Sequence, residues 1–188
     1  MSSAILPPVV AHDEHALSEV SAEPTPTEPK IEGLSIILFS GDLDKALAAF
    51  TIANGAAAMD LPVTMFFTFW GLNVLRREEK VRTAEKKTTM EGMFGRMMPH
   101  GPKDLQVSKL RMGGLGTRLI RREMAKKHVA GLDALLRSAK DQNVRFIACT
   151  MSMNLMGIKK EELIDGISYG NVGAFVDAAD RSRITLFI

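Results

Sequence analysis

Short apolar runs alternate with amphipathic stretches from residue 35 to residue 188. Residues with helical spacing follow Asp42, Gly131 and Asn171, each of which stands at the expected start of a helix. The runs have the composition of strands and lie at residues 35–40, 63–69, 145–149, 167–169 and 184–188. Continuous apolar strands that alternate with helices are typical of a parallel sheet covered on both faces.

We therefore predict an α/β fold with a five-stranded, mostly parallel, flavodoxin-like sheet and helices on both faces. In that fold the strand order is 2-1-3-4-5, so the first and third strands are neighbours. The last run, residues 184–188, is apolar throughout and is expected to close the chain as a buried strand.

Composition divides the chain into parts. Residues 1–33 hold five of the eight prolines and six Asp or Glu against one Lys, which predicts a disordered, acidic, Pro-rich tail. Residues 34–188 form the predicted α/β domain. Within it, about residues 76–130 form a long helical insertion between the second and third strands, basic and rich in methionine.

Several classes of protein are excluded. The single cysteine, Cys149, permits no intramolecular disulfide, and the N-terminus lacks the features of a secretory signal, so we expect a cytoplasmic protein. Charge-free runs at 46–59 and 61–75 are shorter than the roughly 20 residues that span a bilayer. The histidines show no zinc-site spacing, and aromatic residues are not interleaved with basic ones, so neither a metal, another cofactor nor nucleic acid is expected.

Cys149 is the first candidate for chemistry. It ends a predicted parallel strand, at the edge of the sheet where α/β proteins bind ligands. Thr150 and the helix after it would bring backbone N–H groups to the sulfur and favour the thiolate. The alternative is that Cys149 is a small buried hydrophobic residue, a common fate of free cysteines.

The turn Ser40-Gly41-Asp42 follows the first strand. With strand order 2-1-3-4-5, it should face Cys149 across a crevice. Gly41 would allow a close backbone approach, and Asp42 would orient a ligand or move a proton, unless Asp42 only caps the following helix.

A basic stripe lies in the insertion after the loop MGGLGT. The stripe has helical spacing and consists of Arg118, Arg121, Arg122 and Lys126. A solvated helix face is the ordinary explanation, and docking to a membrane surface or an acidic partner is the functional one.

Three segments resemble the DsrE/DsrF/DrsH-like family, in its larger, Met-rich branch that is sometimes labelled peroxiredoxin-like. The resemblance covers about residues 35–188. It rests on SIILFSGDLDKALAAF and its continuation, on MFGRMMPHGPKDLQVSKLRMGGLGT, and on FIACTMSMNLMGIKKEEL, of which Cys-Thr-Met-Ser-Met is the most specific part.

The resemblance implies an α/β fold, a homo-oligomer, and a cysteine after the third strand that accepts sulfane sulfur as a persulfide. That position corresponds to Cys149. The expected function is a sulfur carrier or sulfurtransferase with rhodanese-like or TusA-like partners, in which Thr150, Gly41 and Asp42 support the persulfide. Thiol peroxidase chemistry is not expected, because Phe146 stands where peroxiredoxins place threonine. The alternative is a non-catalytic protein that docks through the basic, Met-rich insertion.

Overall fold

The structure is a computed structural model, and it describes residues 33–79, 81, 83, 87–110 and 112–188. The acidic tail predicted for residues 1–33 lies outside this part of the chain, except for its last residue. Five strands form one sheet, β1 (Gly33–Leu38), β2 (Val63–Phe67), β3 (Arg145–Cys149), β4 (Ser168–Gly170) and β5 (Ser182–Phe187). Every neighbouring pair is parallel, which confirms the predicted α/β class.

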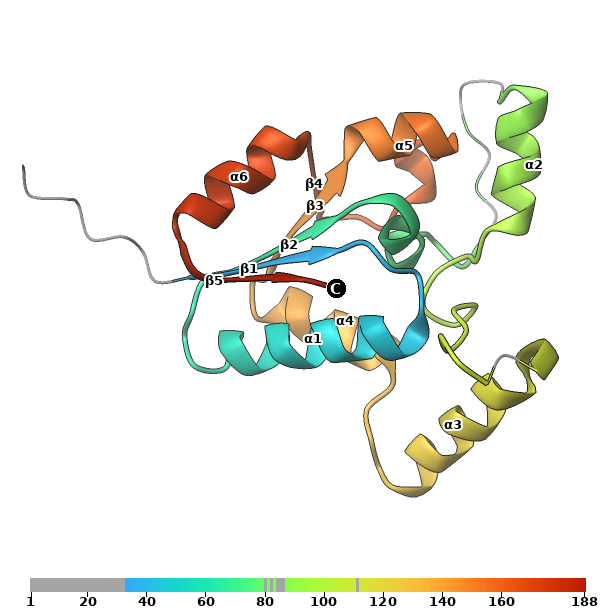
Figure 1. Cartoon of the computed structure of the whole chain (residues 1–188), viewed down its shortest axis with the longest axis horizontal. Coiled ribbons are helices and arrows are strands. Elements are labelled where there is room, and N and C mark those ends of the chain that lie inside the picture. The colour runs from blue at the N-terminus through green and yellow to red at the C-terminus, as the bar shows by residue number, and fades with distance from the viewer. Residues whose placement is uncertain (1–32, 80, 82, 84–86, 111) are drawn as a thin grey trace, which may run out of the picture.

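Helices cover both faces of this sheet (Figure 1). One layer contains α1 (Leu43–Ala57) and α4 (Leu132–Asp141), and the other contains α5 (Thr150–Met156) and α6 (Val172–Asp180). The alternating side chains of the strands supply the core between the layers. Leu34, Ile36 and Leu38 of β1 are all at most 2% exposed and pack in the same cluster as Phe50 of α1.

The strand order is β4-β3-β2-β1-β5, so the expected order 2-1-3-4-5 is wrong. β2 lies between β1 and β3 and pairs with both. The apolar runs indicated which segments are strands. They did not indicate which strands pair, because a strand that is apolar on both faces can be buried beside any neighbour. The consequence is that loops after β1 and β3 are not adjacent.

The prediction that the last strand is buried is also wrong. β5 is an edge strand, paired only with β1, and the exposed fractions of Ile184 and Phe187 are 47% and 69%. An edge position removes cover from one side of a strand, whatever its composition. Phe187 instead stacks on Phe39, which follows β1, with ring centroids 5.8 Å apart.

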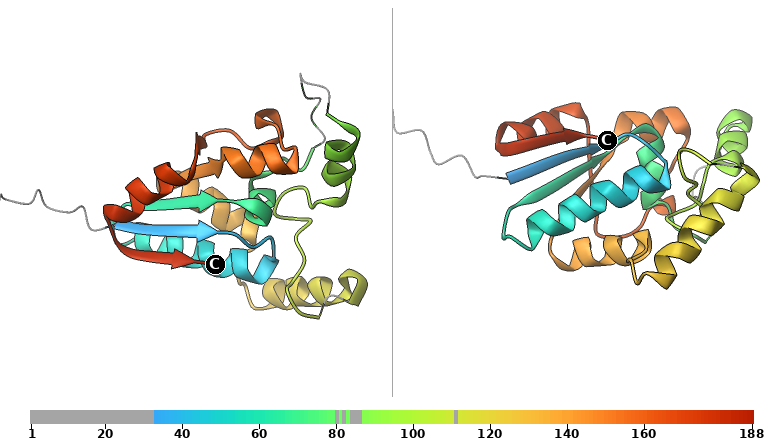
Figure 2. Two further views of the ribbon diagram at one scale, coloured as in Figure 1. Left: turned by 45° about the horizontal axis from the view of Figure 1, so that its top comes forward. Right: turned by 60° about the horizontal axis from the view of Figure 1, so that its bottom comes forward.

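The region between β2 and β3 contains further helices. A 3₁₀ helix, η1 (Phe69–Leu75), follows β2 directly, and α2 (Thr89–Met97), a short 3₁₀ segment η2 (Met112–Gly114) and α3 (Leu115–Lys126) come later. In Figure 2, α2 and α3 lie beside the sheet rather than on either face. Leu105 and Val107, between them, are buried in the main core, so this region is anchored to the domain.

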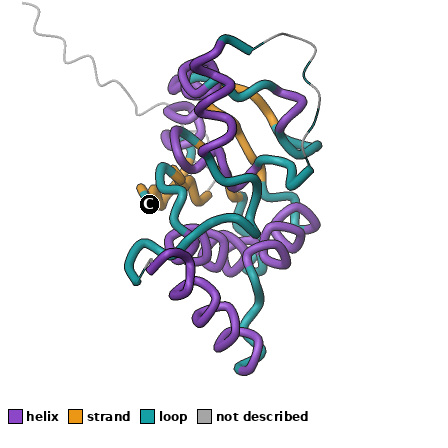
Figure 3. Tube along the Cα trace, turned by 90° about the vertical axis from the view of Figure 1, so that its right-hand side faces the viewer, coloured by secondary structure: helices purple, strands orange, loops and turns teal. Residues whose placement is uncertain are grey.

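The carboxyl ends of the strands meet at one edge, where most of the long loops gather (Figure 3). This edge is the usual location of ligand sites in parallel α/β proteins. The loops after β1, β2 and β3 therefore decide what chemistry the domain supports.

Candidate functional site

Cys149 is the last residue of β3, and α5 begins at the next residue. The residue is 3% exposed and packs in a small cluster with Phe66, Ile147 and Phe175, on the face of the sheet that α6 covers. The expected position at the carboxyl end of a parallel strand is confirmed. The sulfur is covered in this conformation, and its chemistry depends on what surrounds it.

Two hydroxyl groups lie beside the sulfur. Thr68 follows β2, Ser152 lies in the first turn of α5, and their oxygens are 2.8 Å apart. Burial alone would raise the pKa of the Cys149 thiol. Hydrogen bonding from the Ser152 hydroxyl and N–H, the Thr68 hydroxyl and the Met151 N–H outweighs burial and holds that pKa below its usual value. The site therefore favours the nucleophilic thiolate.

Thr150 makes a different contact from the one expected. Its hydroxyl donates to the carbonyl of Gly170 at 3.4 Å, and so joins α5 to β4. The hydroxyls near the sulfur belong to Thr68 and Ser152, which the sequence analysis did not single out. Thr68 was missed because the wrong strand order placed the first strand, not the second, next to Cys149. A support role for Thr150 stays a prediction.

Gly41 and Asp42 line a separate cavity of about 470 Å³, and Cys149 is not among its lining residues. The expectation that their turn faces Cys149 across a crevice is wrong, because β2 and η1 lie between them. Asp42 precedes α1, yet its carboxylate makes no cap hydrogen bond. It accepts from the Ser40 hydroxyl at 3.1 Å and pairs with Lys45 at 3.3 Å.

The four residues of the predicted basic stripe lie on α3, but they do not share one environment. The guanidinium of Arg121 donates to the carbonyls of Pro102 and Leu105, so it holds α3 against the preceding loop. Lys126 pairs with Glu123 at 2.7 Å. Arg118 and Arg122 are exposed. Arg121 is therefore a structural contact, and the exposed residues remain candidates for docking.

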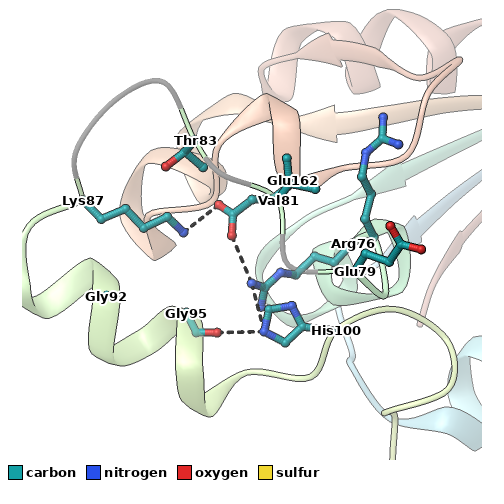
Figure 4. Close-up of a pocket in the computed structure, with 10 residues that line it drawn as sticks. Arg76, Glu79, Val81, Thr83, Lys87, Gly92, Gly95, His100 and Glu162 are labelled. Atoms are coloured by element: carbon teal, nitrogen blue, oxygen red, sulfur yellow. Dashed lines mark hydrogen bonds and ion pairs between the residues drawn. The ribbon is translucent and has the colours of Figure 1, made fainter.

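A buried ion-pair network joins the region between β2 and β3 to the segment between α5 and β4 (Figure 4). Arg76, 1% exposed, donates to Glu162 at 3.2 Å, and Lys87 donates to the same carboxylate at 2.6 Å. Burial would raise the pKa of Glu162, but the Lys159 N–H, Lys87 and Arg76 hold it below its usual range. Sequence spacing gave no signal for this network, because its members are up to 86 residues apart.

His100 lies beside this network. Its Nε2 lies 3.1 Å from the carbonyl of Gly95 and 3.5 Å from a nitrogen of Arg76. Burial and the neighbouring Arg76 charge lower the pKa of His100, so the neutral ring is favoured. Across the described part of the chain, no three His, Cys, Asp or Glu side chains gather as a metal site. None of the helices described there is long and apolar enough to cross a membrane.

The arrangement of a thiol at the end of β3, with donors from β2 and α5, can be compared with known proteins. The model of the DsrE/DsrF/DrsH-like family matches residues 30–187. The chain belongs to this family. The match covers all five strands and the region between β2 and β3, so the resemblance seen in the sequence is confirmed.

Two known proteins are similar in sequence over most of the chain. The Bacillus subtilis protein YrkE, described as uncharacterized, is 47% identical over 154 residues, which cover 82% of this chain and 95% of YrkE. The Allochromatium vinosum sulfur carrier protein DsrE2 is 34% identical over 159 residues, which cover 82% of this chain and 97% of DsrE2.

A solved structure shares the fold at low sequence identity. The Methanobacterium thermoautotrophicum protein MTH1491, of unknown function, superimposes with a TM-score of 0.50 at 14% identity. The alignment covers 84% of this chain and 99% of that one. At this identity, the similarity supports the fold of the chain and says nothing of its function.

Proposed function

We propose that this protein is a sulfur carrier that accepts sulfane sulfur as a persulfide on Cys149 and passes it to a partner thiol. The observation that carries the proposal is the set of donors from Thr68, Met151 and Ser152, which lowers the pKa of the only thiol in the chain. The 34% identity to a protein named as a sulfur carrier supports the same chemistry.

The proposed transfer has two displacement steps and no net oxidation. The Cys149 thiolate attacks the outer sulfur of a donor persulfide; a new S–S bond forms at Sγ as the donor's S–S bond breaks, and the donor leaves as a thiolate. A partner thiolate then attacks the outer sulfur of the Cys149 persulfide, and the Cys149 thiolate leaves. The same hydrogen-bond donors stabilise Cys149 as attacking group and as leaving group.

Because the chain has one cysteine, both partners of the exchange must come from outside it. We infer rhodanese-like or TusA-like proteins, or low-molecular-weight persulfides, as donor and acceptor. The exposed edge strand β5, with Ile184 and Phe187, supports assembly into a homo-oligomer. The cover over Cys149 favours small donors over bulky ones, unless a partner displaces part of α6.

Intact-protein mass spectrometry tests the proposal. The folded protein is incubated separately with thiosulfate, polysulfide and glutathione persulfide; a gain of one sulfur, about 32 Da, that reductant reverses is expected. Cys149→Ser should show no gain. A relocated thiol, Cys149→Ser with Gly55→Cys, controls for position, because Gly55 is exposed and has no neighbour within 4 Å of an added Cβ.

The relocated thiol should gain sulfur more slowly at pH 7, since it lacks the donors around Cys149. Equal rates at the two positions would contradict a dedicated site. A thiol at position 149 that takes up no sulfur and alkylates only after denaturation would show that Cys149 is a buried structural residue.

A second candidate function rests on α3. This helix exposes Leu115, Leu119 and Ile120, each more than 40% exposed, together with basic residues on the same short helix. An apolar and basic helix surface is typical of docking to an anionic membrane or an acidic partner. Sedimentation with anionic lipid vesicles at low salt tests it. Neutralising Arg118, Arg122 and Lys126 should abolish sedimentation, whereas neutralising Lys140 on α4 should not.

A further inference from the structure

The cavity of about 470 Å³ beside Gly41 and Asp42 has walls from three loops at the carboxyl edge of the sheet. These loops are joined by backbone hydrogen bonds. The N–H of Gly71 donates to the carbonyl of Phe39 at 2.9 Å, and the N–H of Leu43 donates to Gln106 at 2.8 Å. The cavity is therefore pre-formed, and its volume falls in the range of small-molecule sites.

Asn73 is a polar residue at this cavity whose amide oxygen lacks a partner. The residue is 1% exposed, and no hydrogen bond reaches its Oδ1. Its backbone is fixed, because its carbonyl accepts from the N–H groups of Arg76 and Gly101. A buried acceptor without a partner is unfavourable, so its place at the cavity indicates a donor supplied by a ligand.

A second acceptor lines the same cavity. The carboxylate of Asp42, 20% exposed, makes no cap hydrogen bond to α1 and instead contacts Ser40 and Lys45. Lys45 is 49% exposed, so this carboxylate already pairs with an ammonium group that solvent reaches. A ligand ammonium would compete with Lys45 for the same oxygen.

Aromatic side chains complete the lining. Trp70 is 49% exposed and Phe39 is 36% exposed, and both belong to the cavity wall. Gly41 permits this arrangement, because an added Cβ would lie 2.9 Å from the carbonyl oxygen of Trp70. Aromatic rings attract cations and cover the apolar part of a small ligand.

We propose that this cavity binds a small ligand through a primary ammonium group. The ammonium has three donors and no acceptor, which suits a cavity whose lining includes the acceptors Asn73 and Asp42. The apolar part of the ligand lies against Trp70 and Phe39. The inference does not rest on the sulfur-carrier proposal, and Cys149→Ser is expected to leave binding unchanged.

Trp70 is the only tryptophan of the chain and lines this cavity, so its fluorescence reports ligand binding there. The probe is benzylammonium, compared with benzyl alcohol, which lacks the charge, and phenylacetate, which reverses it. A saturable fluorescence change with benzylammonium is expected, with affinity about tenfold or more above that for either control.

Three variants assign the contacts. Asp42→Asn and Asn73→Leu should each weaken benzylammonium binding about tenfold. Lys45→Gln should strengthen it, because the competing ammonium is removed. Asp60→Asn, an exposed acid after α1, is the matched control and should change nothing. If Asn73→Leu fails to fold, the opposite effects of Asp42→Asn and Lys45→Gln still test the proposal.

Each contrary outcome overturns the proposal. Equal binding of benzyl alcohol would mean an apolar cavity without ammonium recognition. Tighter binding of phenylacetate would assign the cavity to anions through Lys45. The absence of a saturable change with benzylammonium would show that no such site exists.

Discussion

The loops after β1 and β3 leave the same edge of the sheet, yet they build different surroundings. After β3, Cys149 is 3% exposed within an apolar cluster, and a few hydroxyl and N–H donors surround its sulfur. After β1, Gly41 and Asp42 line an open cavity with acceptors and half-exposed aromatic rings. In our proposals, the loop after β3 stabilises a thiolate anion, and the cavity beside the loop after β1 binds a cation.

The segment after β2 explains how both environments coexist. Thr68, the first residue beyond β2, contacts Ser152 and hydrogen-bonds to Cys149, whereas Trp70 and Asn73 of η1 line the other cavity. Residues only a few positions apart in one segment thus lie at different sites. Two motifs at the ends of parallel strands meet only when their strands are neighbours, and here β2 separates them.

Gly71 joins the two sites, and its substitution has the largest expected effect. An added Cβ would overlap the carbonyl of Leu38, at the end of β1. Gly71→Ala should therefore lower the free energy of unfolding by about 3 kcal/mol, and it should disturb both sites at once. Urea denaturation measures the change in stability.

Gly55→Ala is the matched control for that measurement. Gly55 lies within α1, and an added Cβ meets nothing within 4 Å. Alanine should stabilise the helix there by up to about 1 kcal/mol. If both alanine variants kept or gained stability, the close contact between the loops after β1 and β2 would be disproved.

The sequence predicted the elements better than their neighbours. The apolar runs located the five strands and placed Cys149 at the end of the third one. Asn171 was predicted to cap a helix, and its side chain accepts from the N–H of Ala174 at the start of α6. Strand order depends on packing between segments far apart in sequence, and the apolar pattern does not predict that packing. Thr68, Ser152 and the Arg76–Glu162 pair went unnoticed because their roles arise only from that packing.

The donors around the sulfur should move the pH dependence of its reactivity. Ser152→Ala or Thr68→Val removes a hydroxyl that favours the thiolate, so the thiol pKa rises and less thiolate is present at pH 7. The rate of iodoacetamide alkylation at pH 7 should fall severalfold, and its pH profile should shift to higher pH. Ser138→Ala, on α4 in the other layer, is the control and should leave the profile unchanged.

Removing part of the side-chain cover over Cys149 should change its alkylation rate by a smaller factor. Phe175 of α6 is 8% exposed and lies 5.6 Å from Phe66, centroid to centroid, in the cluster that contains the thiol. Phe175→Leu should cost about 1 kcal/mol of stability and raise the alkylation rate a few-fold. Phe50→Leu, in the core on the other face, should cost a similar amount without raising the rate. Equal acceleration by both would mean that global unfolding, not local cover, limits access.

The smallest expected effect is that of a change in the cavity beside Asp42 on the reactivity of Cys149, because the two sites are separate. Asp42→Asn removes a charge from the cavity after β1, and that cavity does not include Cys149. Its carboxylate is also absent from the groups that set the thiol pKa. Alkylation of Cys149 and its pH profile should therefore change less than twofold in Asp42→Asn, while benzylammonium binding falls about tenfold. A shifted pH profile in this variant would show that the loops after β1 and β3 are coupled across β2. It would also support the prediction from the sequence that Asp42 acts on the persulfide at Cys149.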